Sequence, residues 1–165
     1  MIYRTLARAP GAATVWRARD LTAYDGPLLL DTHIWIWYLE GSVASMHKSV
    51  VPLLERSAAA SGLRVSDISY WEVAVKAAKG RLTLAIDASI WLRRAEQAPG
   101  IQFHPLDRET LLLSTRLAGT AHNDPADRML IATAQLNGIP LVTVDEQIVD
   151  YARAHPGTPV VDART

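Results

Sequence analysis

The chain has 165 residues, 49% of them hydrophobic, and its 17 lysines and arginines balance 17 aspartates and glutamates. This length and apolar content suit one compact domain, and zero net charge excludes a general positive field that would attract nucleic acid. The lack of cysteine excludes disulfides, thiolate metal sites and cysteine nucleophiles. No apolar run approaches the ~20 residues of a membrane span. We therefore expect a cytoplasmic protein with no membrane partner.

The first 27 residues predict no regular element, since they show no lasting periodicity and end in the breaker Gly26-Pro27. We expect residues 1–27 to be an N-terminal extension that is poorly ordered, as chain termini commonly are. A basic arm that contacts a partner or RNA is the alternative. The domain itself is expected over residues 28–165.

Short apolar strands and amphipathic helices alternate from residue 28 onwards. Strands are expected at residues 28–30, 63–66, 101–105, 139–144 and 160–161. Helices are expected at residues 33–40, 44–60, 67–79, 87–98, 107–117, within 122–138 and at 146–153, with Pro52 implying a kink or a late start in the second helix. This alternation predicts a three-layer α/β/α fold with a mainly parallel sheet and right-handed crossovers.

The stretch from residue 122 to residue 145 combines a helix and a strand with acids at both ends. Asp124 followed by Pro125 is typical of an N-cap and a first helical position. Gly138 is expected to end the helix, and the β-branched run after it delivers Asp145. Ligands of open α/β sheets bind at the carboxyl ends of strands and the starts of helices. Residues 122–145 are therefore expected to form part of a ligand-binding or active site.

Acids elsewhere in the chain are expected to join this site. Asp31 ends the first leucine strand, and Asp145 follows a late strand; neighbouring parallel strands lie ~4.8 Å apart. Asp127, in the first turn of the central helix, and Glu72, on the third helix, can reach the same pocket. Clustered carboxylates repel one another unless a cation neutralises them or some of them take up protons. A set of ligands that offers only oxygen atoms fits Mg²⁺ or Mn²⁺. Such a centre supports phosphodiester hydrolysis, with a carboxylate as general base.

Each acid also has a purely structural interpretation. Asp124 and Asp127 could both cap the central helix, and Asp145 could cap the helix that starts at Glu146. Glu72 and Lys76 have the spacing of an exposed ion pair on a helix. Asp31 has no capping role except for the helix that it immediately precedes.

Aromatic and basic residues near the acids are less informative. Four tryptophans at helical spacings suit core or interface positions better than base stacking: Trp35, Trp37, Trp71 and Trp91. Four cations flank the acids and could contact phosphates, although solvated surface charge is commoner: Lys76, Lys79, Arg81 and Arg128. The histidines lack the ligand spacing of a zinc site.

Four blocks of sequence together resemble the PIN-domain ribonucleases, in particular the VapC-type toxins of type II toxin–antitoxin systems. The blocks are L-L-L-D-T-H at 28–33, S-D-I-S-Y-W-E-V-A-V-K at 66–76 followed by G-R-L at 80–82, H-N-D-P-A-D-R-M-L-I-A-T-A at 122–134, and L-V-T-V-D at 141–145. Any one block alone would be weak, but the order and spacing of all four make the resemblance specific.

The resemblance implies an α/β/α PIN fold and a Mg²⁺- or Mn²⁺-dependent endoribonuclease that acts on RNA. It also implies a cognate antitoxin that blocks the site and a toxin homodimer. The implied catalytic and metal-binding acids are Asp31, Glu72, Asp127 and Asp145, with Asp124 as an accessory metal-site acid. Thr143 matches the small polar residue that precedes the last aspartate.

Two other functions remain open at the level of sequence. One is a non-catalytic protein-binding module whose acids are all helix caps. The other is an aspartyl phosphatase with Asp31 as nucleophile. The phosphatase is disfavoured because the second residue after Asp31 is His33 and not another acid.

Overall fold

A single parallel sheet forms the centre of the protein, whose computed structural model describes residues 14–119 and 123–165. Its strand order is β1-β6-β5-β2-β3-β4, and every neighbouring pair is parallel. The strands are β1 (Val15–Arg17), β2 (Leu28–Leu30), β3 (Leu63–Ser66), β4 (Ile101–His104), β5 (Leu141–Thr143) and β6 (Val160–Asp162).

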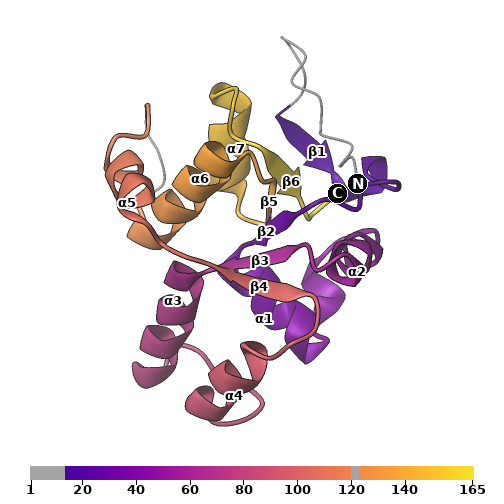
Figure 1. The fold of residues 1–165 in the computed structure, drawn as a ribbon, viewed down its shortest axis with the longest axis vertical. Helices are drawn as coiled ribbons and strands as arrows, with labels where there is room; N and C mark the ends of the chain where they lie inside the picture. Colours follow the sequence, from indigo (N-terminus) through magenta and orange to yellow (C-terminus); the bar gives the residue numbers. More distant parts are fainter. Residues whose placement is uncertain (1–13, 120–122) are drawn as a thin grey trace.

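Helices cover both faces of this sheet, as Figure 1 shows for α1 and α2 against α6 and α7. The helices are α1 (Thr32–Glu40), α2 (Val50–Ala59), α3 (Asp67–Ala78), α4 (Ala88–Ala95), α5 (Arg108–Thr115), α6 (Pro125–Asn137) and α7 (Glu146–Ala154). Residues of α1 to α4 dominate one hydrophobic cluster, and residues of α6 and α7 the other. The predicted three-layer α/β/α fold is confirmed. No helix in the described ranges is long and apolar enough to cross a membrane.

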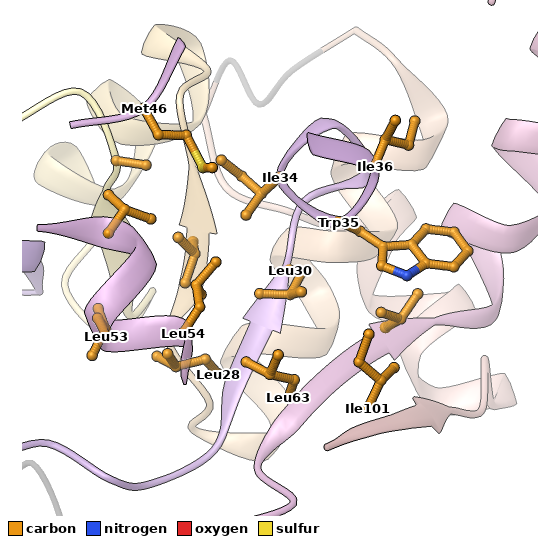
Figure 2. Close-up of a cluster of buried hydrophobic side chains, with 14 of the residues drawn as sticks. Leu28, Leu30, Ile34, Trp35, Ile36, Met46, Leu53, Leu54, Leu63 and Ile101 are labelled. Atoms are coloured by element: carbon orange, nitrogen blue, oxygen red, sulfur yellow. The ribbon is translucent and has the colours of Figure 1, made fainter. Parts of the chain in front are cut away.

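Strand β2 joins the two hydrophobic layers. Successive strand side chains point to opposite faces, so Leu28 and Leu30 enter one cluster and Leu29 the other, all fully buried. Figure 2 shows Leu28 and Leu30 beneath the α1 residues Ile34 and Trp35. A strand buried on both faces requires an apolar run without alternation, which explains the three consecutive leucines.

Helix boundaries follow the local sequence. Helix α2 starts at Val50, six residues later than the expected range begins, which places Pro52 in the first turn. There a backbone N–H would have no partner within the helix, so proline costs little. Gly41 and Gly138 end α1 and α6 with φ of 70° and 62°, a left-handed conformation that glycine adopts without strain.

The order of the strands reverses beside β2. From β2 the chain builds outward through β3 and β4, and then returns to add β5 and β6 on the other side of β2. In such sheets the crevice at the carboxyl ends of the two strands at the reversal is the usual ligand site. The register pairs Leu30 with Val142, so the next residues, Asp31 and Thr143, meet at this crevice.

Residues 14–27 are the described part of the expected N-terminal extension, and they include one strand. Strand β1 extends the sheet at β6, with Val15 opposite Val160. Thr14 Oγ1 donates a hydrogen bond to the Ala152 carbonyl at 2.9 Å, and Leu21 is only 6% exposed. A three-residue strand is too short to show a periodicity, so β1 could not be predicted from the pattern of residues. The remaining part of the expected extension, residues 1–13, lies outside the described residues.

We expect the fold to require residues 14–27. A variant that begins at residue 21 loses β1 and exposes the apolar edge of β6, which should lower the free energy of unfolding by about 2 kcal/mol or more. A variant that begins at residue 14 keeps β1 and is the matched reference for this comparison. Urea titration followed by circular dichroism measures both, and equal midpoints for all three proteins would contradict the structural role of β1.

Candidate active site

Five acids gather at the carboxyl edge of the sheet, where the strand order reverses. The central one is Asp127, in the first turn of α6. Its pKa is raised to about 8, first by burial and then by the negative charges of four other acids. Those four are Asp31, Asp124, Asp145 and Glu72. The structure therefore brings the other four predicted site acids within electrostatic reach of Asp127.

Asp31 is the most enclosed of the aspartates at this edge, with 5% of its surface exposed. Burial raises the pKa of Asp31, and the charge of Glu72 raises it further, whereas a hydrogen bond from Thr143 and the nearby His33 act in the opposite direction. Asp31 occupies the N-cap position of α1, but its side chain makes no capping hydrogen bond. Capping therefore does not explain this acid.

Thr143 links the acids that follow β2 and β5. Its hydroxyl donates to Asp31 Oδ2 at 2.6 Å and accepts from the backbone N–H of Asp145 at 2.9 Å. A hydroxyl can serve as donor and acceptor at once, so one fully buried side chain fixes both the carboxylate of Asp31 and the start of α7. This is a positioning role for the residue that the resemblance had identified only as small and polar.

Glu72 is buried, which corrects the exposed-pair interpretation. Its ion pair with Lys76 is present, but Glu72 is only 8% exposed. Thr32 Oγ1 donates to Glu72 Oε2 at 2.6 Å and lies 2.9 Å from Ser69 Oγ. Helix spacing predicts the i,i+4 pair of Glu72 and Lys76, but it cannot predict that Thr32 of α1 also binds Glu72.

Thr32 and Ser69 are the site residues that the sequence analysis missed. Both are buried polar side chains at this edge of the sheet, and they place Glu72 opposite the end of β2. Thr32 directly follows Asp31, and Ser69 is three residues before Glu72. A hydroxyl next to a suspected acid was the available signal, although serine and threonine are too common near helix starts for it to be specific.

Asp124 and Asp145 do cap helices. Asp124 Oδ1 accepts from the backbone N–H of Ala126 at 2.8 Å, and Asp145 Oδ1 accepts from those of Gln147 and Ile148 at 2.8 and 3.1 Å. These bonds fix each carboxylate at a helix start and keep its charge at the same edge as Asp31. For these two residues the capping interpretation is correct, and it is compatible with a place in the site.

The chemistry of the site suits a hard cation. The five acids offer only oxygen donors, and the pKa values of Asp31 and Asp127 are raised first by burial and further by the charges of neighbouring acids. Within residues 14–119 and 123–165, no group of three or more histidine, cysteine, aspartate or glutamate side chains is arranged as a ready metal-ligand set. The acids thus share an electrostatic environment without forming a coordination shell.

Comparison with known proteins agrees with this geometry. The family model described as "PIN domain" matches residues 28–154, well over half of the chain. The chain belongs to the PIN-domain family. The matched range contains all five acids together with Thr32, Ser69 and Thr143. Strands β1 and β6 of this PIN-domain protein lie outside the matched range.

Individual relatives of this PIN-domain chain support the assignment. Ribonuclease VapC22 of Mycobacterium tuberculosis is 33% identical over 133 residues, which are 79% of this chain and 96% of that protein. Two solved structures share the fold at lower identity. A toxin–antitoxin complex from Klebsiella pneumoniae has a TM-score of 0.50 at 22% identity, covering 81% of this chain and 95% of that chain. VapBC2 from Rickettsia felis, bound to a DNA fragment from their promoter, has a TM-score of 0.55 at 13% identity, covering 81% and 96%. The resemblance predicted from four sequence blocks is confirmed.

We expect the charge of Asp127 to destabilise the PIN domain when divalent ions are removed. The pKa of about 8 in the folded state exceeds the ordinary value of about 4, so the folded chain holds a proton that the unfolded chain releases between these values. The contribution of Asp127 to the free energy of unfolding is most favourable below about pH 4 and declines as pH rises towards 8. Asp127→Asn removes the charge and should stabilise the chain by about 2 kcal/mol above pH 8, with little gain near pH 4.

Urea unfolding in EDTA across this pH range measures the effect. Asp150→Asn is the matched control, because Asp150 is an exposed aspartate on α7 that pairs only locally with Arg153. Its difference from the parent should be small and should not follow the same pH course. A stability gain for Asp127→Asn that stays constant from pH 4 to pH 8 would contradict the raised pKa.

Proposed function

We propose that this chain is a Mg²⁺- or Mn²⁺-dependent endoribonuclease that acts as the toxin of a toxin–antitoxin pair. The observation that carries the proposal is the gathering of five acids around Asp127 at the point where the strand order reverses. Buried carboxylates in excess of neighbouring cations are costly. A site that maintains them suits binding of a divalent cation.

The residues that would hold the cation are Asp31, Asp127 and Asp145, with Asp124 as an accessory. When bound, such an ion supplies neutralising charge for the phosphodiester and lowers the pKa of a water molecule. Thr143 keeps Asp31 and Asp145 at a fixed separation. Glu72, held by Thr32 and Lys76, either takes the proton from the attacking water as general base or holds the ion through a water.

The biological role is supported by the relatives. The Mycobacterium tuberculosis relative is named a ribonuclease, and the solved structures with this fold include a toxin–antitoxin complex. We therefore propose RNA as substrate and a cognate antitoxin protein as the inhibitory partner. The homodimer and the cytoplasmic location stay predictions from the resemblance and the sequence.

Cleavage of RNA tests the activity directly. We expect the chain, purified free of its antitoxin, to cut RNA with Mg²⁺ or Mn²⁺, and we expect Asp31→Asn and Asp127→Asn each to lower the rate about 10²-fold or more. Asp150→Asn should cut like the parent, because Asp150 is exposed on α7 and outside the acid cluster. Undiminished cleavage by both folded site variants would refute the proposal.

Metal binding also separates the nuclease from a non-catalytic module whose acids are only caps. Millimolar Mn²⁺ or Mg²⁺ should raise the thermal midpoint of the parent, because a ligand that binds only the folded state stabilises it by about 2.7 kcal/mol at a hundred times its Kd. Asp31→Asn should lose most of this rise, and Asp150→Asn should keep it. Equal midpoints of the parent with metal and with EDTA would favour the non-catalytic module.

A further inference from the structure

A groove of about 620 Å³ lies beside the acid cluster, between α3 and the start of α6. Its lining includes Glu72 and Asp124, so a molecule in the groove reaches the acids. The floor is apolar and includes Ile68, Val75 and Met129. Three acids and three cations also line the groove, and the cations lie towards the end of α3 and just beyond it: Asp67, Glu72 and Asp124, and Lys76, Lys79 and Arg81. The groove therefore combines an apolar surface with acids close to the proposed reaction site and cations towards and beyond the end of α3.

Trp71, which lines this groove, differs from the tryptophans of the core. It is 58% exposed, whereas Trp35 is fully buried and Trp91 is 6% exposed. Helical spacing predicted core or interface positions for all four tryptophans, and the exposure of Trp71 excludes the core for this one. Trp71 directly precedes Glu72 in the sequence, and its exposed side chain shares the lining of the groove with that acid.

The basic residues continue along α3 from this aromatic ring. Trp71, Val75 and Lys79 follow one another at intervals of four residues. They therefore lie on one face of α3, with Lys79 at its C-cap. The distance from Trp71 to Lys79 along the helix axis is about 12 Å. Lys79 and Arg81 are exposed, and neither forms an ion pair with another described residue. Their charge is available to a ligand.

We propose that Trp71, Lys79 and Arg81 form a subsite for single-stranded RNA that extends from the acid cluster along α3. In it, Trp71 stacks on a base next to the scissile phosphate, and the two cations contact phosphates further along the strand. This assignment rests on the proposed ribonuclease function.

The chemistry of the groove favours RNA over a protein segment. An aromatic face followed by cations is the pattern that binds unpaired bases and their backbone. An apolar peptide would use the floor but would need neither Lys79 nor Arg81. The chain has zero net charge, so a local basic path of this kind is required if a polyanion is to approach a negatively charged site.

Affinity for RNA tests the subsite apart from cleavage. The probe is a fluorescein-labelled oligoribonucleotide of mixed sequence, titrated in EDTA and followed by anisotropy, with all variants built on the cleavage-deficient Asp31→Asn chain. We expect Trp71→Ala to weaken binding about 5-fold to 100-fold, which corresponds to the loss of one stacked base. Trp71→Phe should restore most of the affinity, since the phenyl ring also stacks.

Matched controls separate stacking and charge from surface changes in general. Leu112→Ala removes another exposed apolar side chain, 51% exposed on α5 and outside the groove, and should bind like the parent. Lys79→Gln and Arg81→Gln should each reduce the dependence of log affinity on log salt by about 0.7, the single-strand value per phosphate contact. Arg94→Gln, at an exposed position on α4, should leave that slope unchanged.

The outcomes distinguish this inference from the nuclease proposal. If the unaltered chain cleaves RNA with metal but Trp71→Ala binds the probe as tightly as its parent, the subsite is refuted and the groove is left to a protein partner. If the unaltered chain does not cleave but binding depends on Trp71 and on both cations, the subsite stands and the nuclease function fails. An effect of Leu112→Ala as large as that of Trp71→Ala would also refute the subsite.

Discussion

The hydrogen bond from Thr143 to Asp31 joins β5 to β2 where the strand order reverses. It is possible only because the register sets Leu30 opposite Val142, so that the residues after them meet. The same hydroxyl accepts from the Asp145 backbone and thereby fixes the start of α7. The pairing of strands in the core thus determines where Asp31 and Asp145 lie, and with them the position of the site.

Negative charge concentrated at this edge is an energetic cost of the architecture. Asp31 and Glu72 are both buried, and the pKa of Asp127 is raised by its burial and by the other acids. Two hydroxyls and one lysine offset part of the cost by holding Asp31 and Glu72. Sites that retain such unfavourable charge do so for function more often than for stability.

Acids at strand ends and helix starts could be placed from the sequence. Contacts between residues far apart in the chain could not. Asp31 and Asp145 could be placed at one edge because parallel strands share their carboxyl ends. The burial of Glu72 depends on Thr32, forty residues earlier, and its helical spacing with Lys76 suggested exposure. For Trp71 the helical spacing predicted a core or an interface position, and the exposed side chain excludes only the core. Strand β1 is recognisable only through its pairing with β6.

Strand β1 also has a consequence for how this chain meets other copies of itself. By pairing with β6, it covers a strand whose Val160 and Val161 are fully buried and takes over one margin of the sheet (Figure 1). An uncovered apolar margin is a template for pairing between chains and hence for aggregation. A margin only three residues long that ends in Arg17, which is held by Asp20, is a poor template, so β1 protects solubility as well as completing the fold.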